Sequence, residues 1–213
     1  MTEDRISGFI RSLRRPENEF LDRIRKEAGE NGVPVIRPET AGLLSFFTEF
    51  LQPEQVLELG TAVGYSALLM LQSMPESGSI TTIENWAPRI EEAKKNFEEA
   101  GVSERIRLIE GDVSRVLPEL SGPYDLVFMD AAKAQYIRWL PEVKRLLRPG
   151  GLLISDNILQ EGDVLESRYA VTRRDRTIHK RMREFLDALY TDPELTTMTV
   201  PLGDGVTVTR KRI

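Results

Sequence analysis

Apolar residues recur every three or four positions over about the first fifty residues of the chain, a spacing typical of amphipathic helices. The pattern predicts helices over 6–13, 17–30 and 38–51, the first two separated by Pro16. From residue 56 onward it changes to short apolar or β-branched runs that alternate with helical segments. The runs predict strands over 56–59, 79–84, 106–111, 124–130 and 151–157. The segments between them predict helices over 66–74, 87–100 and 135–147, the last ended by Pro149-Gly150-Gly151. Strands that alternate with helices predict an α/β fold with a parallel sheet covered on both faces.

The end of the chain departs from this alternation. After a polar loop over 158–172, the pattern predicts a helix over 174–190 and two strand-like runs over 195–202 and 205–213. Gly203-Asp204-Gly205 between two β-rich runs is typical of a hairpin turn. We therefore expect the sheet to finish with an antiparallel strand.

Length and composition limit the classes of protein to which the chain can belong. Its 213 residues, 40% of them hydrophobic, suffice for one sizeable core. We expect a single domain, with 1–33 as a helical extension and 34–213 as the core. The sequence has no cysteine, which excludes thiolate catalysis and zinc–thiolate sites. It has no apolar run of membrane-spanning length either, so we expect a cytoplasmic protein without a membrane partner.

Charge is distributed unevenly along the chain. The net charge of -5 argues against a protein that coats nucleic acid non-specifically. However, residues 168–183 hold seven basic residues and one acid, so this stretch carries +6 and the remainder -11. A local basic face can guide a polyanion. The alternative is a solvated helix face whose arginines pair with acids elsewhere.

Acidic or polar residues stand at the carboxyl end of one expected strand after another. They are Glu58, Glu84, Asp112, Asp130 and the pair Asp156-Asn157. In an open α/β sheet the ligand crevice lies outside the carboxyl ends of the strands. We therefore expect these residues to face one cleft.

The loop from Glu58 to Ser66 indicates a nucleoside-containing cofactor. Gly60 and Gly64 allow a ligand to approach the backbone and the following helix N-terminus, although two glycines in such a turn also serve packing. Glu84, at the end of the next strand, can accept hydrogen bonds from ribose hydroxyls. The second glycine of the dinucleotide fingerprint is replaced by Ala62, so close approach of a pyrophosphate is not provided for. S-adenosylmethionine, which has no phosphate, fits better.

Asp130 and the pair Asp156-Asn157 predict a metal site. They follow two strands that are consecutive in the sequence, and adjacent strands lie about 4.8 Å apart. Two carboxylates and an amide oxygen can then converge on one hard cation, Mg²⁺ or in its place Mn²⁺ or Ca²⁺. The alternative is ordinary turn chemistry, because Asp and Asn also make Asx-turns at strand ends.

Together these motifs resemble the metal-dependent O-methyltransferase family that includes catechol and caffeoyl-CoA methyltransferases. The resemblance covers roughly 34–213. It is carried by Glu58-Leu-Gly-Thr61, Gly64-Tyr65-Ser66, Glu84, Gly111-Asp112, Asp130 through Lys133, Arg148-Pro149-Gly150-Gly151 and Asp156-Asn157. The combination is specific.

The resemblance implies a Rossmann-like class I methyltransferase fold, with a mostly parallel seven-stranded sheet and an antiparallel C-terminal hairpin strand. It implies that Asp130, Asp156 and Asn157 bind the metal, that Lys133 is the catalytic base, and that the protein is a homodimer. The expected contacts with S-adenosylmethionine combine the residues that the resemblance implies with those of the loop from Glu58 to Ser66. They are Ile36, Glu58, Gly60, Ser66, Glu84, Asp112, Val113 and Asp130.

A narrower resemblance is to the bacterial branch that methylates 5-hydroxyuridine at the wobble position of tRNA. It depends on residues 173–183 and on Leu202-Gly-Asp-Gly205. It implies the tRNA anticodon region as partner, contacted by Arg173, Arg174, Arg176 and Lys180. The alternatives are a small-molecule acceptor of the catechol type and a binding protein without catalysis. His179, the only histidine, is left out of the predicted catalytic set, because a lone helical histidine is more often a surface or packing residue.

Overall fold

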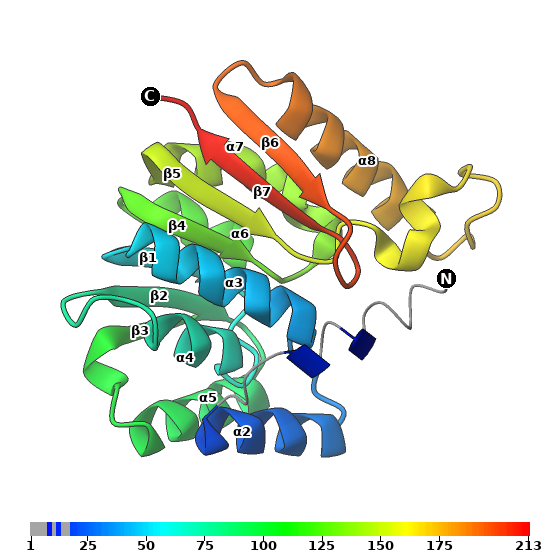
Figure 1. Ribbon diagram of the computed structural model, residues 1–213. Helices are drawn as coiled ribbons and strands as arrows, with labels where there is room; N and C mark the ends of the chain where they lie inside the picture. Colours follow the sequence, from blue (N-terminus) through cyan, green and yellow to red (C-terminus); the bar gives the residue numbers. More distant parts are fainter. Residues whose placement is uncertain (1–7, 10–11, 14–17) are drawn as a thin grey trace.

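The computed structural model describes residues 8–9, 12–13 and 18–213, which fold around one seven-stranded sheet (Figure 1). The strand order is β3-β2-β1-β4-β5-β7-β6. The strands are β1 (Gln55–Leu59), β2 (Ser79–Glu84), β3 (Ile106–Glu110), β4 (Tyr124–Met129), β5 (Leu147–Ser155), β6 (Leu195–Val200) and β7 (Val206–Lys211). Strands β1 to β5 are parallel, and β7 is antiparallel to both β5 and β6. The predicted mostly parallel sheet with a C-terminal hairpin is confirmed.

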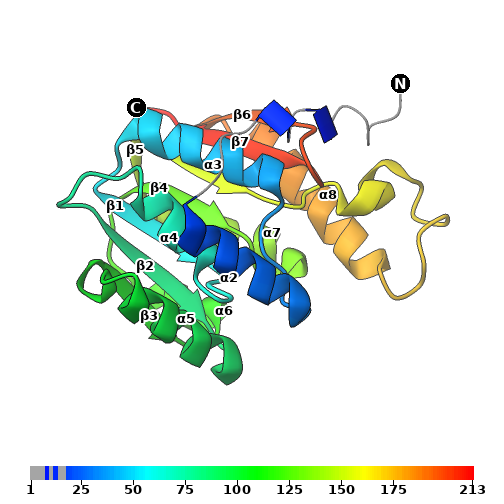
Figure 2. The same cartoon turned by 60° about the horizontal axis from the view of Figure 1, so that its bottom comes forward.

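Helices cover both faces of this sheet (Figures 1 and 2). One face carries α3 (Pro38–Leu51), α4 (Tyr65–Leu71) and α5 (Ala87–Glu99), with α2 (Glu19–Glu30) packed against α4. The other carries α6 (Val113–Val116), α7 (Tyr136–Leu146) and α8 (Arg176–Thr191). Within the described ranges, no helix combines the length and the hydrophobicity that crossing a bilayer requires.

Two hydrophobic cores lie on either side of the sheet because side chains alternate along each strand. In β4, Leu126 and Phe128 enter the core under α3 and α4, while Val127 and Met129 enter the core under α7 and α8. All four side chains are fully buried. A strand buried on both faces reads as a continuous apolar run, which is why β4 stands out in the sequence.

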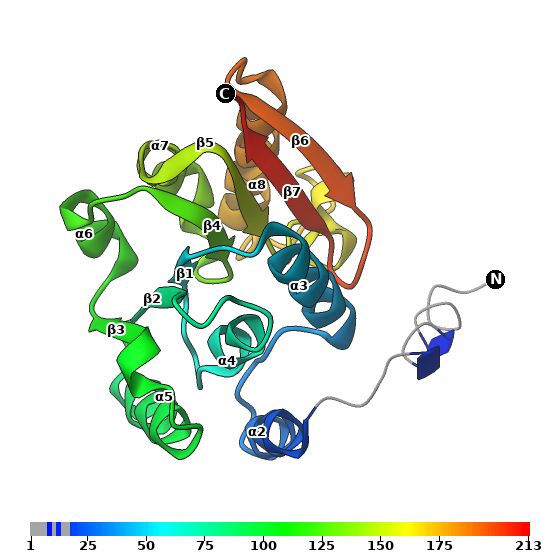
Figure 3. The same cartoon turned by 60° about the vertical axis from the view of Figure 1, so that its left-hand side comes forward.

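The sheet grows in two directions from β1. The chain places β2 and β3 on one side of β1 and then returns to place β4 on the other (Figure 3). The carboxyl ends of β1 and β4 are therefore neighbours, and the Asp130 N–H donates to the carbonyl of Leu59 at 3.0 Å. Such a switch point is where open α/β sheets form their ligand crevice.

Some boundaries differ from the sequence prediction. Strand β5 begins at Leu147, directly after α7, whereas the pattern predicted a strand over 151–157, so Pro149 and Gly150 lie inside the strand. The polar loop contains a short 3-10 segment, Gln160–Leu165, and α8 begins at Arg176. Of the helix predicted over 6–13, the structure describes 8–9 and 12–13, and the other half lies outside the described residues.

Candidate active site

A cavity of about 570 Å³ opens at the carboxyl ends of the central strands. Its walls come from the loops after β1, β2, β3, β4 and β5 and from the segment that precedes α3. The structure brings nearly all of the predicted cofactor, metal and base residues to this one cavity. Those that line it are Ile36, Gly60, Ser66, Glu84, Asp112, Val113, Asp130, Lys133, Asp156 and Asn157.

Gly60 allows the loop after β1 to lie against the end of β4. Its φ of +102° is in the region that favours glycine, and a Cβ there would overlap the backbone carbonyl oxygen of Asp130. Two backbone bonds hold the loop on its other side, since the N–H groups of Gly60 and Thr61 both donate to the carbonyl of Ile83, at 3.1 and 3.2 Å. The floor of the cavity is therefore fixed by main-chain contacts among three strand ends.

Glu84 is held at the end of β2 by backbone donors. Its Oε1 accepts from the N–H groups of Asn85 and Trp86, and its Oε2 accepts from the N–H of Ala62 at 3.0 Å. The side chain is mostly buried yet lines the cavity. Oε2, with one bond to protein, keeps a lone pair for a ligand hydroxyl.

Glu58 is the exception among the predicted cofactor residues, because it is fully buried and does not line the cavity. Its two carboxylate oxygens accept hydrogen bonds from the hydroxyls of Ser66 and Thr82, each at 2.5 Å. Burial raises the pKa of Glu58 from its ordinary value of 4.5 to about 7, against the two hydrogen bonds, which lower it. Glu58 thus orients Ser66, which does line the cavity.

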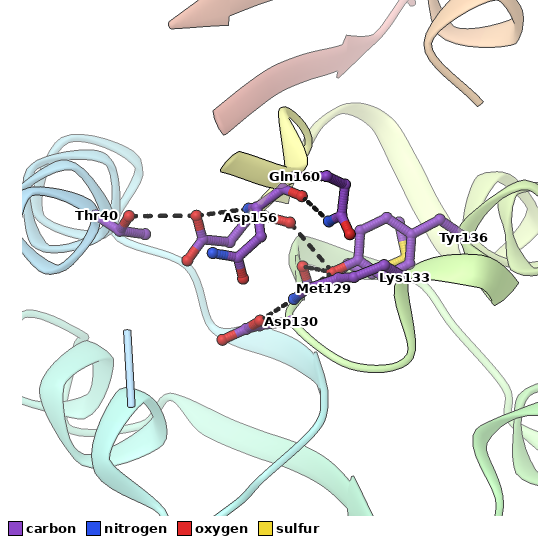
Figure 4. Close-up of polar contacts among 8 residues, drawn as sticks. Thr40, Met129, Asp130, Lys133, Tyr136, Asp156 and Gln160 are labelled. Atoms are coloured by element: carbon purple, nitrogen blue, oxygen red, sulfur yellow. Dashed lines mark hydrogen bonds and ion pairs between the residues drawn. The ribbon is translucent and has the colours of Figure 1, made fainter. Parts of the chain in front are cut away.

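Asp156 stands at the end of β5 with its carboxylate turned toward α3 (Figure 4). Its Oδ1 accepts from the hydroxyl of Thr40 at 3.3 Å and from the N–H of Asn157 at 2.8 Å. Burial, together with the negative charge of Asp130, raises its pKa from 3.8 to about 6. Two carboxylates at neighbouring strand ends therefore repel each other across this part of the cavity.

Lys133 neutralises part of the negative charge of these two carboxylates. Its ammonium pairs with Asp130 Oδ1 and also donates to the hydroxyl of Tyr136 at 3.2 Å (Figure 4). Tyr136 in turn donates to the carbonyl of Met129 at 2.8 Å. Burial alone would lower the pKa of Lys133, but Tyr136, Asp130 and Asp156 together raise it above its ordinary value. In this arrangement Lys133 holds its proton.

The donor set at this end of the cavity fits a hard divalent cation. Asp130 and Asp156 offer carboxylates and Asn157 an amide oxygen, all from the ends of two paired strands. Burial first, and then the charge of Asp130, raise the pKa of Asp156, and a cation bound beside the two carboxylates would oppose both effects. Among the described residues, no group of three or more His, Cys, Asp or Glu side chains is arranged to hold a metal ion, and the set here has only two carboxylates. The metal site remains a prediction.

A second cavity, of about 400 Å³, adjoins the first. Lys133 and Asn157 line both cavities. The other walls of the second cavity come from the segment after β5, the start of α8 and the hairpin turn. They are Gln160, Glu161, Asp163, Asp175, Ile178, His179 and Asp204. Ile178 is the one aliphatic residue among them.

The predicted RNA-contacting residues lie outside both cavities. Arg173 and Arg174 are exposed just before α8 and make no hydrogen bond or ion pair with any described residue. Arg176 donates to the carbonyl of Val171 at 3.3 Å, and Lys180 pairs with Glu184 at 3.6 Å. Only the first two arginines therefore extend freely into solvent.

Several residues of the site were missed by sequence reasoning. Thr40 contacts Asp156 from a helix 116 positions earlier, and no local pattern signals such a pair. Arg37 lines the first cavity from the segment that precedes α3, and Trp139 lines it from α7. Tyr136 has a detectable signal, since it stands three residues after Lys133 at the start of a helix.

Comparison with known proteins identifies the family to which the chain belongs. The chain matches the family model described as O-methyltransferase over residues 11–212. It is 31% identical over 167 residues to a catechol O-methyltransferase from Niastella koreensis, which covers 76% of each chain. It is 29% identical to tapetum-specific methyltransferase 1 of Arabidopsis thaliana, covering 92% of this chain and 88% of that one. Among solved structures, the O-methyltransferase TomG from Streptomyces achromogenes in complex with S-adenosylmethionine has a TM-score of 0.87 at 25% identity and covers 100% of both chains.

The doubly wound sheet with a cavity at its switch point, together with the likeness to an S-adenosylmethionine-bound O-methyltransferase, assigns the chain to the class I methyltransferase fold. The chain belongs to the O-methyltransferase family and is an S-adenosylmethionine-dependent O-methyltransferase.

Glu58→Gln tests the electrostatics of the cofactor cavity. Because the folded-state pKa of Glu58 is about 7, above the ordinary 4.5, the stability that protonated Glu58 contributes is fully present below about pH 4.5 and is lost as the pH rises through 7. Glutamine keeps both hydroxyl partners but does not titrate. On going from pH 5 to pH 8, the free energy of unfolding of the variant should therefore rise by about 2 to 3 kcal/mol relative to that of wild type. Urea unfolding at the two pH values measures this gain, with the exposed Glu104→Gln as control. An equal difference at both pH values would contradict the prediction.

Proposed function

We propose that this enzyme methylates the 5-hydroxyl group of 5-hydroxyuridine at the wobble position of tRNA, and that Asp130, Asp156 and Asn157 hold a divalent cation that assists the reaction. The observation that carries the proposal is the polar second cavity, which meets the cofactor cavity at Lys133 and Asn157. An acceptor in the second cavity would present its hydroxyl at this junction.

A cation at the two carboxylates has a definite chemical use. Mg²⁺, or Mn²⁺ or Ca²⁺ in its place, would supply positive charge that lowers the pKa of a neighbouring hydroxyl. Asp130 and Asp156 contribute two negative charges and Asn157 a neutral oxygen. So small a set of protein ligands would leave coordination positions for oxygens of the acceptor.

Lys133 is the residue that takes the hydroxyl proton, at Nζ. Its pKa is raised while its ammonium faces Asp130, so this role requires Asp130 to turn its charge to another partner. S-adenosylmethionine supplies the methyl group, which leaves sulfur and bonds to the hydroxyl oxygen. The chain contributes alignment, because its two cavities hold the ligands on either side of Lys133. Alignment of this kind is worth up to about 7 to 11 kcal/mol.

The walls of the second cavity favour a nucleoside over a flat apolar ring. A uracil ring has two carbonyls and an N–H, and ribose adds hydroxyls, so all can pair with polar walls. A catechol ring is apolar over most of its surface and offers no donor to a wall carboxylate such as that of Asp163 beyond its two hydroxyls. Outside the cavity, the exposed and unpaired Arg173 and Arg174 suit the phosphates of a polynucleotide.

A catechol-type acceptor is the second candidate function. The observation that favours it is the 31% identity with the catechol O-methyltransferase of Niastella koreensis. The two vicinal hydroxyls of a catechol could approach Asp130 and Asp156 in the same way as the hydroxyl and ring carbonyl of 5-hydroxyuridine. The two candidate functions differ in the role of Arg173 and Arg174, which would bind RNA phosphates in the first and would not contact the acceptor in the second.

Nucleosides of tRNA from a strain that lacks the gene test the proposed acceptor. Mass spectrometry should detect accumulated 5-hydroxyuridine and loss of 5-methoxyuridine, and a plasmid copy of the gene should reverse both changes. If the deletion strain has the same 5-hydroxyuridine and 5-methoxyuridine contents as wild type, the tRNA proposal is wrong and the catechol candidate is favoured.

Asp156→Ala tests the proposed cation. Loss of one carboxylate should lower kcat by about a thousandfold or more while the Kd for S-adenosylmethionine changes less than about threefold. Chelation with EDTA should abolish wild-type activity, and added Mg²⁺ should restore it. Asp187→Ala, an exposed carboxylate on α8, is the matched control. Full activity after exhaustive chelation would contradict the cation.

The double variant Arg173→Ala/Arg174→Ala tests the RNA surface. Removing two phosphate contacts should raise KM for tRNA about tenfold at low salt and flatten its dependence on salt concentration. Lys26→Ala/Arg107→Ala removes the same charge at exposed positions that line neither cavity. A KM for tRNA equal to that of wild type would exclude these arginines as an RNA surface.

A further inference from the structure

His179 occupies an unusual position for the only histidine of the chain. It lies in the first half of α8, is only 5% exposed, and lines the second cavity. The segment that follows β5, drawn in yellow in Figure 1, lies against this end of α8. The imidazole is thus buried between that segment and the helix, at a wall of the acceptor cavity.

The contact of its Nε2 determines which nitrogen carries the proton. Nε2 lies 3.0 Å from the backbone carbonyl oxygen of Glu166. A carbonyl oxygen can only accept, so Nε2 must be the donor. In the neutral imidazole Nδ1 then has no hydrogen and presents a lone pair.

That lone pair has no partner. Nδ1 is buried and accepts no hydrogen bond from any residue that the structure describes. A buried acceptor left unsatisfied costs about 1 to 3 kcal/mol, and native structures rarely retain one without a reason. A donor that arrives with a ligand would satisfy it.

The rest of the cavity narrows the kind of ligand. The side chains of Glu161, Asp163 and Asp175 offer acceptors, and Lys133 is the one cation among the lining residues. A ligand that fits these walls has to present N–H or O–H groups. A uracil ring has such a group at N3, flanked by carbonyls, whereas a cytosine N3 is an acceptor and a catechol has no donor beyond its two hydroxyls.

We infer that Nδ1 of His179 accepts a hydrogen bond from the N3–H of the acceptor base, which makes His179 a residue that selects uracil. The inference rests on the proposed function, because it identifies which edge of the base the same cavity reads. A site built around a substrate N–H rejects an analogue that lacks it far more strongly than a site that relies on shape alone.

The test compares two acceptors in one RNA. Anticodon stem-loops carry either 5-hydroxyuridine or its N3-methyl derivative at the wobble position, and kcat/KM is measured for both with wild type, His179→Gln and His179→Asn. The glutamine amide can still donate to the Glu166 carbonyl but provides no acceptor at the position of Nδ1. The shorter asparagine can place its amide oxygen there instead.

Wild type should prefer 5-hydroxyuridine strongly. H179Q should lower kcat/KM for 5-hydroxyuridine about tenfold or more and leave that for the N3-methyl acceptor nearly unchanged, while H179N should keep more of the preference. The ratio between acceptors does not depend on the folded fraction of a variant, so partial unfolding does not obscure the result.

Two outcomes would overturn the inference. If H179Q lowers kcat/KM equally for both acceptors, or for neither, His179 serves packing and does not read the base. If wild type methylates neither RNA, the proposed function fails and the inference fails with it. The first outcome leaves the proposed function standing, so the two failures are distinguishable.

Discussion

Concentrated negative charge at the carboxyl edge of the sheet is the constraint on which the rest of the site depends. Glu58, Glu84, Asp130 and Asp156 end four strands that lie side by side. The pKa values of Glu58 and Asp156 are raised, mainly by burial and further by charged neighbours. Such an edge favours ligands that carry positive charge, and both a divalent cation and the sulfonium of S-adenosylmethionine meet that requirement. Once the methyl group has left, the sulfur is neutral and this attraction is gone.

The same edge separates two tasks. Toward β1 and β2, the loop around Gly60 and the carboxylate of Glu84 form a cavity whose shape is set by backbone contacts. Toward α8, the walls are side chains from a loop and a helix end, with several acceptors and few donors. Lys133 and Asn157 belong to both cavities. The cofactor cavity is therefore shaped largely by backbone contacts, whereas the cavity proposed for the acceptor is shaped by side chains.

The sequence predicted the elements well where local pattern decides them. Buried strands such as β2 and helices such as α3, which starts at Pro38, have clear periodicity and begin and end where expected. The start of β5 was missed because Pro149 and Gly150 normally end elements, whereas here they lie within a strand. The cavity residues at strand ends were also predictable, because parallel strands bring their carboxyl ends to one edge.

What the sequence could not predict depends on contacts between distant segments. The Thr40 hydroxyl reaches Asp156 across 116 positions, and the Nε2 bond of His179 is made to a backbone carbonyl that any residue could supply. Glu58 was expected to face the cofactor, but the pleat turns it inward to Ser66 and Thr82. The ion pair between Lys133 and Asp130 raises the pKa of the lysine, opposite to what a base requires. These details follow from packing and charge in three dimensions.

The most direct test of the account is a crystal structure of the protein grown with Mn²⁺ and S-adenosylhomocysteine, with anomalous diffraction recorded for manganese. An anomalous peak should lie between the carboxylates of Asp130 and Asp156, within bonding distance of the Asn157 amide oxygen, and the Lys133 ammonium should be released from Asp130. A peak at some other position, or none together with an intact pair between Lys133 and Asp130, would contradict it.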